Sequence, residues 1–216
     1  MTKTLFIETR QKFEDKDINF SLLDKLPGKT ISLAATIQYL DLIPTIKKYL
    51  EKNQKKVILK KGAFYEAHVL GCNSNAFDSK SDTLLLLTDG KFHAINNAVQ
   101  LQKEIYVFNT KTLEKVSFED IQKINNKRTA AIKKFLSSDR VGILVTTKPG
   151  QNYKQINQLK NKIEKLGKRV YIFESNNINI AEFENFKIQI WVNTACFGLA
   201  MDNSNIVNFQ DILQYI

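Results

Sequence analysis

Several residue types and patterns are scarce in this sequence, and each shortage excludes a class of protein. Cysteine occurs only at positions 72 and 196, which excludes a disulfide-rich secreted scaffold and favours a thiol or metal-ligand role. No stretch approaches the ~20 apolar residues of a membrane span, and the first residues lack the apolar region of a signal peptide. We therefore expect a soluble, cytoplasmic protein without a membrane partner.

Arginine is also scarce, although the chain carries a formal charge of +10. Only four arginines are present, at positions 10, 128, 140 and 169. The lysines are spread over expected helix faces, without a tight basic cluster or aromatic residues between the charges. We expect no direct binding of nucleic acid, whereas attraction to an acidic or ribosome-bound partner stays open.

Apolar residues make up 43% of the 216-residue chain, which is enough for one large domain or two small ones. The expected strands are 3–8, 29–35, 55–59, 83–87, 105–109, 140–146, 168–174 and 188–192. The expected helices are 20–26, 41–52, 94–101, 117–137, 152–166 and 178–186, with a further short one from Asn73 or Ser74 towards Phe77. This alternation predicts an α/β fold with parallel sheets and right-handed crossovers.

A weak internal repeat divides the chain into two halves. Residues 31–36, followed by Gln38, resemble residues 141–146, followed by Gln151. We predict two similar Rossmann-like domains, each a small parallel sheet flanked by helices. They span residues 1–116 and 139–216, and a connecting helix at 117–138 joins them.

Each half supplies one cysteine near a strand end, where α/β sheets carry their functional groups. Cys196 follows the strand 188–192, and Cys72 follows the apolar pair Val69-Leu70 and a glycine. Such cysteines are either ligands of a metal or iron-sulfur cluster or ordinary buried thiols. The residues alone leave both interpretations open, because the chain has no CxxC pair.

Two turns also carry candidate functional groups. Residues 88–93 offer Gly90 for close backbone approach and His93 for a proton or hydrogen bond. Residues 147–151 combine Lys, Pro, Gly and Gln at a strand-to-helix turn, a common place for an anionic ligand group. Either turn can instead be a simple connection, and we interpret His68 as a loop residue and Trp191 as packing.

Six short segments follow one another over nearly the whole chain. They are residues 32–38, Val69-Leu70-Gly71-Cys72, Thr88-Asp89-Gly90-Lys91-Phe92-His93, Lys127-Arg128 with Ile132, Thr147-Lys148-Pro149-Gly150-Gln151 and Val192-Asn193-Thr194-Ala195-Cys196. In this order they resemble the diphthamide biosynthesis family, the radical S-adenosylmethionine enzymes of the first step of diphthamide formation.

The resemblance implies three similar α/β domains, each giving one cysteine to a 4Fe-4S cluster. It implies transfer of a 3-amino-3-carboxypropyl group from S-adenosylmethionine to a histidine of translation elongation factor two. Cys72 and Cys196 would be the cluster ligands of the second and third domains. The resemblance also implies catalytic roles for Gln151 and His93 and a cofactor pocket lined by Gln38, Gly90, Phe92, Lys148, Gly150, Asn193 and Thr194.

The chain departs from the family pattern in several places. It resembles only the second and third domains, with residues 3–8 matching the last strand of the first, so the first domain and its cysteine are missing. Phe197-Gly198 replaces the usual Pro-Arg, Ala94 replaces the Pro after the Phe-His pair, and Ala67-His68 replaces a Gly-Gln pair.

Three hypotheses remain. In a split enzyme, a separate chain supplies the missing domain and its cysteine. A non-catalytic subunit would instead dock on an active relative, as a homo- or hetero-dimer partner, or on the elongation factor. The third hypothesis is a protein that binds a nucleotide-like ligand and has no cluster.

Overall fold

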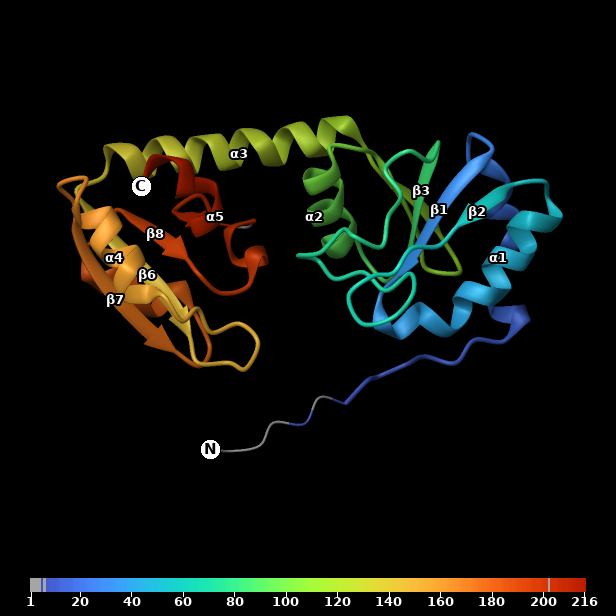
Figure 1. The fold of residues 1–216 in the computed structure, drawn as a ribbon, viewed down its shortest axis with the longest axis horizontal. Coiled ribbons are helices and arrows are strands. Elements are labelled where there is room, and N and C mark those ends of the chain that lie inside the picture. The colour runs from blue at the N-terminus through green and yellow to red at the C-terminus, as the bar shows by residue number, and fades with distance from the viewer. Residues whose placement is uncertain (1–4, 6, 202) are drawn as a thin grey trace. The chain divides into compact units, whose positions relative to one another are not determined.

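The computed structural model describes residues 5, 7–201 and 203–216. The chain divides into two compact units, residues 1–123 and 124–216, and the division falls within the long helix α3 (Phe118–Ser137). Each unit is a sheet with helices packed on it, so the α/β class predicted from the sequence is confirmed (Figure 1).

The sheet of the first unit has the strand order β2-β1-β3-β4-β5. Its strands are β1 (Thr30–Ala35), β2 (Lys56–Ile58), β3 (Thr83–Leu87), β4 (Ile105–Phe108) and β5 (Leu113–Val116). The pairs β1–β2, β1–β3 and β3–β4 are parallel, whereas β5 runs antiparallel to β4. The first sheet is thus parallel, as predicted, except for one antiparallel strand at its edge. The side chain of Asn109 accepts hydrogen bonds from the backbone N–H of Lys111 (3.1 Å) and Thr112 (2.7 Å), which reverses the chain directly after β4.

The helices of the first unit are η1 (Asp15–Asp17), η2 (Phe20–Lys25), η3 (Ile37–Leu42), α1 (Ile43–Lys52) and α2 (Phe92–Leu101). Helix α1 buries Ile46 and Leu50 in a core that also contains Leu33 and Leu85 of the sheet. Burial of this apolar face at helical spacing stabilises α1, because exposing such side chains costs about 1.5–3 kcal/mol each.

The second unit contains a wholly parallel sheet with the strand order β7-β6-β8-β9. Its strands are β6 (Arg140–Thr146), β7 (Arg169–Ser175), β8 (Ile190–Asn193) and β9 (Ile206–Asn208). Its helices are α4 (Ile156–Glu164), η4 (Ile180–Phe186), η5 (Phe197–Ala200), α5 (Phe209–Ile212) and η6 (Leu213–Tyr215).

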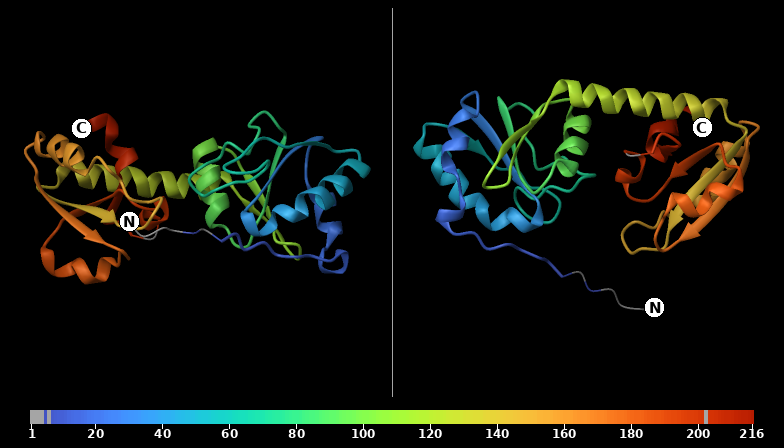
Figure 2. Two further views of the ribbon diagram at one scale, coloured as in Figure 1. Left: turned by 60° about the horizontal axis from the view of Figure 1, so that its bottom comes forward. Right: turned by 180° about the vertical axis from the view of Figure 1, so that it is seen from behind.

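Helices lie on both faces of this sheet (Figure 2), and alternating side chains of β6 point to opposite faces. Val141 and Ile143 pack in a cluster with Phe135 of α3 and Leu159 of α4. Leu144 points to the opposite face, in a second cluster formed with residues of η4 and η5. Both faces are thus covered, which is the normal environment of a parallel sheet.

Two local expectations are wrong. Among residues 3–8, the described positions Leu5, Ile7 and Glu8 lie in no strand, and the other positions lie outside the described residues. Glu8 instead contacts Arg10 (3.0 Å). Residues 73–77 form turns rather than a short helix.

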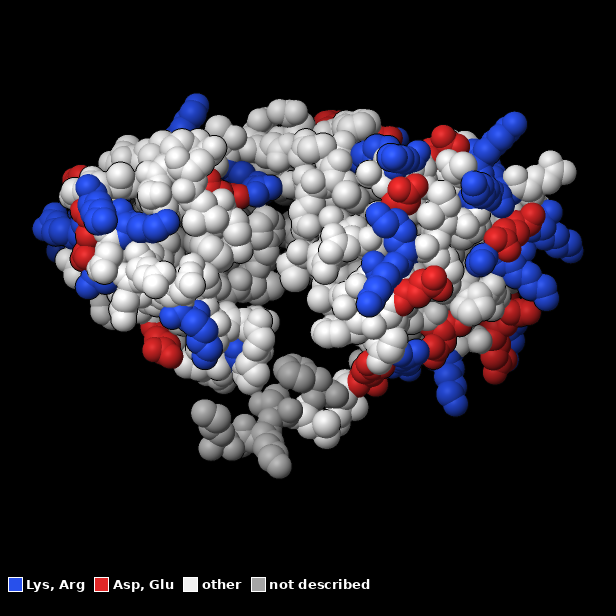
Figure 3. Space-filling model, viewed as in Figure 1, with Lys and Arg blue, Asp and Glu red and all other residues white. Residues whose placement is uncertain are grey.

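The surface charge and the helix lengths bear on the possible partners of the chain. On the face drawn in Figure 3, lysine and arginine side chains are scattered among acidic ones rather than gathered in one cluster. Among the helices of the described residues, none is long and apolar enough to cross a membrane.

Candidate metal and cofactor site

Cys196 lies three residues beyond the end of β8, and its thiol is free and exposed. The side-chain amide of Asn193 donates hydrogen bonds to the carbonyl oxygen of Cys196 (2.8 Å) and to Oδ1 of Asn208 (2.7 Å). Its own Oδ1 accepts the backbone N–H of Ala195 (3.0 Å). Asn193 is 1% exposed, so it supports the Cys196 turn from the buried side.

Thr194 is also buried, and its hydroxyl donates to the carbonyl oxygen of Leu144 (2.8 Å) on the neighbouring strand. The side chains of Asn193 and Thr194 therefore bond to the protein. Their place in the site is beneath the turn that presents the cysteine.

A cavity of about 240 Å³ opens beside Cys196 at the carboxyl edge of this sheet. It is lined by Thr146, Lys148, Gln151, Asn176, Asn177, Ile178, Ala195, Cys196 and Leu199. The fold thus brings together Lys148, Gln151 and Cys196, all of which were predicted as site residues. Gly150 lies in the same turn with φ of +80°, a conformation that favours glycine.

The sequence interpretation missed three residues of this cavity, Asn176, Asn177 and Ile178. They follow β7, and the hydroxyl of Thr146 donates to the carbonyl oxygen of Asn176 (3.1 Å). Their signal was available, since a polar pair directly after a parallel strand belongs at the same edge as the other strand ends.

In the first unit, Cys72 lies beyond a segment that extends along the end of β1. Ala35, the last residue of β1, donates to the carbonyl of Ala67 (2.8 Å) and accepts from the N–H of Val69 (2.9 Å). The loop then reaches Cys72, whose thiol is free and exposed.

Helix α2 holds this loop in place. The side chain of Asn97 donates to the carbonyl oxygens of Leu70 (3.0 Å) and His93 (2.7 Å). The side chain of Gln100 donates to the carbonyl oxygen of Gly71 (3.1 Å). Two amide side chains on one helix therefore fix the backbone directly before Cys72.

Phe92 and His93 pack beside the same loop. A Cβ at Gly71 would lie 3.1 Å from Cε1 of Phe92 and 3.6 Å from Cδ2 of His93, so the two rings lie directly against this part of the loop. The two rings meet edge to face with centroids 5.3 Å apart, and Phe92 is 42% exposed. Burial holds the pKa of His93 below its usual range, and the nearby His68 adds to this. The predicted residues Phe92 and His93 thus adjoin the loop of Cys72.

Gln38 and Gly90 lie in turns at the same edge of this sheet. Thr36, which precedes η3, donates its N–H to the carbonyl oxygen of Leu87 (3.1 Å), so the turns after β1 and β3 are neighbours. Gln38 is exposed within η3, and Gly90 has φ of +69°. Neither residue has a contact with Cys72 that would assign it a role.

His68 is a loop residue, as interpreted, but it is only 3% exposed. Its ring lies near Phe64 and Tyr65, at centroid distances of 5.7 and 5.9 Å. Within the described part of the chain, its Nδ1 has no hydrogen-bond partner. Burial lowers the pKa of His68, which favours the neutral ring.

The model of the diphthamide synthesis protein family matches residues 1–211. The chain belongs to this family. A 2-(3-amino-3-carboxypropyl)histidine synthase of Methanocaldococcus jannaschii is 32% identical over 166 residues, covering 71% of this chain and 43% of the relative. The synthase of Pyrococcus horikoshii is 25% identical over 189 residues, covering 86% of this chain and 55% of the relative. The chain thus spans about half the length of the curated relatives it matches.

Solved structures support the family fold. The crystal structure of Dph2 from Pyrococcus horikoshii matches with a TM-score of 0.78 at 23% identity, over 90% of this chain and 59% of that chain. The structure of the same protein with a 4Fe-4S cluster matches with a TM-score of 0.77 at 24% identity, over 90% and 58%. These likenesses confirm the fold.

Each unit of the chain carries one thiol of the kind that ligates iron-sulfur clusters. Cys72 and Cys196 are both free and exposed, and thiolates are the usual ligands of iron-sulfur clusters. Among the described residues, no group of three or more His, Cys, Asp or Glu side chains could hold a metal ion. One cysteine belongs to each unit, so the chain offers two thiolates, one fewer than a cluster with a single open iron needs.

Proposed function

We propose that this chain is one component of a diphthamide-forming transferase. The enzyme moves a 3-amino-3-carboxypropyl group from S-adenosylmethionine to a histidine of translation elongation factor two. The observation that carries the proposal is an exposed, free thiol on a supported turn in each of the two units. Membership of the diphthamide synthesis family supports a role of these thiols in diphthamide formation.

In this proposal Cys72 and Cys196 ligate a 4Fe-4S cluster, and a separate chain supplies the first domain with the third cysteine. When bound, the cluster would supply the electron for reductive cleavage of S-adenosylmethionine. As the family resemblance implies, Gly90, Phe92 and Gln38 would line the cofactor pocket in the first unit, and Gly150 would shape the turn of Lys148 in the second. Asn193 and Thr194 support the wall that carries Cys196.

The polar groups have separate roles in binding and proton transfer. The ammonium of Lys148 and the amide of Gln151 line the Cys196 cavity, where they would bind and orient the carboxylate of the amino-acid part of S-adenosylmethionine. His93 is mainly neutral because its pKa is lowered, so it would accept a proton from the target histidine.

Anaerobic reconstitution with iron and sulfide tests this proposal. The chain is reconstituted alone and together with a candidate protein for the missing domain, and visible absorbance, methylthioadenosine and the mass of the elongation factor are measured. We expect all three signals only in the mixture. Cys72→Ser and Cys196→Ser should each abolish them, whereas the exposed control Lys80→Met should not. A mixture with neither cluster absorbance nor cleavage of S-adenosylmethionine would refute the proposal.

A non-catalytic subunit is the second candidate. It is favoured by Phe197-Gly198, which stands where the family resemblance leads us to expect Pro-Arg after the last cysteine. In that case the chain should form a stable complex with an active relative, and both Cys→Ser variants should retain full activity in the complex. Binding of S-adenosylmethionine without a cluster would instead indicate a nucleotide-like ligand site.

A further inference from the structure

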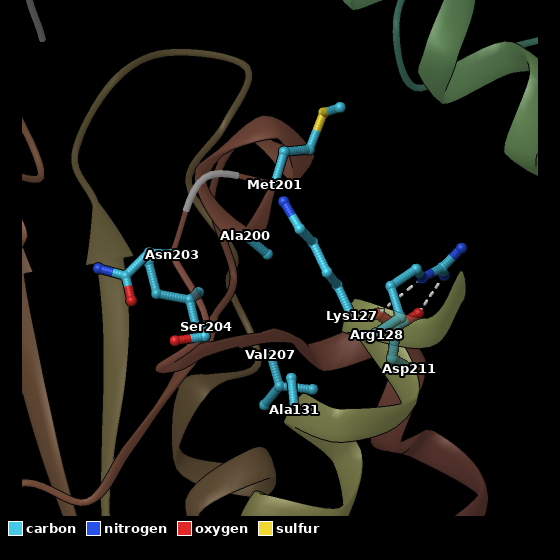
Figure 4. A pocket seen from close by; sticks show the side chains of 10 residues that line it. Lys127, Arg128, Ala131, Ala200, Met201, Asn203, Ser204, Val207 and Asp211 are labelled. Carbon is cyan, nitrogen blue, oxygen red and sulfur yellow. Dashed lines mark hydrogen bonds and ion pairs between the residues drawn. The ribbon is translucent and has the colours of Figure 1, made fainter. Parts of the chain in front are cut away.

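Arg128 of α3 forms a two-pronged ion pair with Asp211 of α5. Its Nε donates to Oδ2 of Asp211 at 3.2 Å, and a terminal NH2 group contacts Oδ1. The side chain of Asp211 is only 6% exposed. Figure 4 shows the two side chains meeting beside a cavity of about 170 Å³. A bidentate pair of this kind fixes the plane of the guanidinium as well as its position.

The same guanidinium lies over the ring of Phe197, with its central carbon 5.2 Å from the ring centroid. Phe197 directly follows Cys196 and begins η5. The guanidinium therefore bonds to Asp211 through its N–H groups and contacts, through its central carbon, the residue next to the cysteine. A cation over an aromatic face is attracted by about 0.5–1 kcal/mol when partly exposed.

Other contacts also restrain η5. Leu199 and Ala200 pack against the cluster of Leu144, Trp191 and Ile206, and the side-chain amide of Asn208 donates to the carbonyl oxygen of Phe197 at 3.4 Å. All four residues of η5 are half-buried. The cavity in Figure 4 lies between α3 and the segment that follows η5, with Lys127 extending towards Met201. The apolar cluster holds the end of η5 that is distant from Cys196, whereas the contact between Arg128 and Phe197 acts on the residue next to the cysteine.

We propose that Arg128 is a positioning residue for Cys196. Asp211 orients the guanidinium, the guanidinium holds the ring of Phe197, and the ring sets the direction in which η5 leaves the cysteine. Asn193 donates to the carbonyl oxygen of Cys196, so a buried amide and the ring of the next residue together restrain the backbone that leaves the cysteine. The functional meaning of this role rests on the proposed cluster, but the restraint itself belongs to the free protein.

Amide hydrogen exchange on the cluster-free protein tests the restraint. The N–H groups of Leu199 and Met201 bond within η5, to the carbonyls of Cys196 (3.1 Å) and Gly198 (3.0 Å), so their exchange reports opening of the turn. Phe197→Leu removes only the ring, and Arg128→Lys keeps the charge near Asp211 but loses the planar group. Each variant should raise both exchange rates about two- to fivefold.

The double variant and a matched control make the test specific. Because both substitutions break the same contact, the double variant should exchange no faster than the faster single one. Lys133→Met, an exposed change on the same helix, should leave both rates unchanged. The exchange rate of the Val192 amide should stay the same in every variant. Unchanged rates in both single variants, or effects that multiply in the double variant, would overturn the role of Arg128.

A second measurement separates this inference from the proposed function. In the reconstituted mixture, Phe197→Leu and Arg128→Lys should each speed the loss of cluster absorbance to a chelator by a similar factor. If no mixture forms a cluster, the proposed function fails while the exchange result still stands. If the cluster forms but both variants release it at the original rate, Arg128 does not position the cysteine for the cluster.

Discussion

The side-chain amide of Asn193 donates a hydrogen bond to the carbonyl oxygen of Cys196 at 2.8 Å. A strand residue thus fixes the backbone of the exposed cysteine that follows it three positions later. The same amide group bonds to Oδ1 of Asn208 (2.7 Å), so β8, β9 and the Cys196 turn share one buried side chain.

Asn193→Asp should therefore destabilise the protein. The substitution replaces a donor with a carboxylate that faces two oxygen acceptors in a buried position, at a cost of about 2–4 kcal/mol. Urea denaturation should detect this loss. The exposed Asn205, whose Oδ1 already accepts from Lys134, is the matched position, and Asn205→Asp should change stability by less than about 0.5 kcal/mol. Equal stability of the two variants would contradict the buried role of Asn193.

The loop of Cys72 should loosen when its bonds to α2 are removed. Asn97→Leu leaves the carbonyls of Leu70 and His93 without this partner, and we expect a loss of about 1–3 kcal/mol. Gln100→Ala removes one exposed bond and should cost less than about 1 kcal/mol. Limited proteolysis should cut residues 70–75 faster in the Asn97 variant. An unchanged cleavage rate there would show that α2 does not hold the loop.

Stability should fall in mildly acidic solution because of the two histidines. Burial lowers the pKa of His68, with Arg10 adding to the shift and Glu8 opposing it, and burial also lowers that of His93. The folded protein then binds fewer protons than the unfolded chain. The free energy of unfolding should be level above pH ~6.5 and decrease as the pH falls below it. Denaturation measured between roughly pH 5 and 7.5 gives this free energy at each pH. Its dependence on pH should be weaker in His68→Gln. An unchanged pH dependence would exclude His68 as a source of the effect.

The ion pair of Arg128 and Asp211 should show strong non-additivity. Arg128→Met leaves a buried carboxylate without its partner and should cost about 3 kcal/mol or more. The double variant Arg128→Met with Asp211→Leu removes both charges and should recover most of that loss. Thermal unfolding of the two single variants and the double variant measures the coupling. Additive losses would mean that the pair contributes nothing as a pair.

The strands whose bounds were predicted correctly are apolar along nearly their whole length. Strand β3 consists of Thr83–Leu87 and β6 of Arg140–Thr146, the same bounds as predicted, because buried parallel strands are continuous apolar runs between polar turns. Strand β5 was missed, because Leu113–Val116 contains two charged residues and pairs only after the Asn109 turn reverses the chain. The three-residue strand β9 is too short to show a period.

For the site, the sequence alone predicted which strand ends carry the candidate groups. It predicted Lys148, Gln151 and Cys196 as site residues, and the carboxyl ends of parallel strands do meet at one edge. The direction of each side chain was decided only by the tertiary structure. Asn193 and Thr194 point into the protein because the carbonyls of Cys196 and Leu144 need donors there, and those carbonyls are positioned by the fold. Arg128 reaches Phe197, 69 positions away in the chain, only because α3 and α5 pack together and Asp211 fixes its plane.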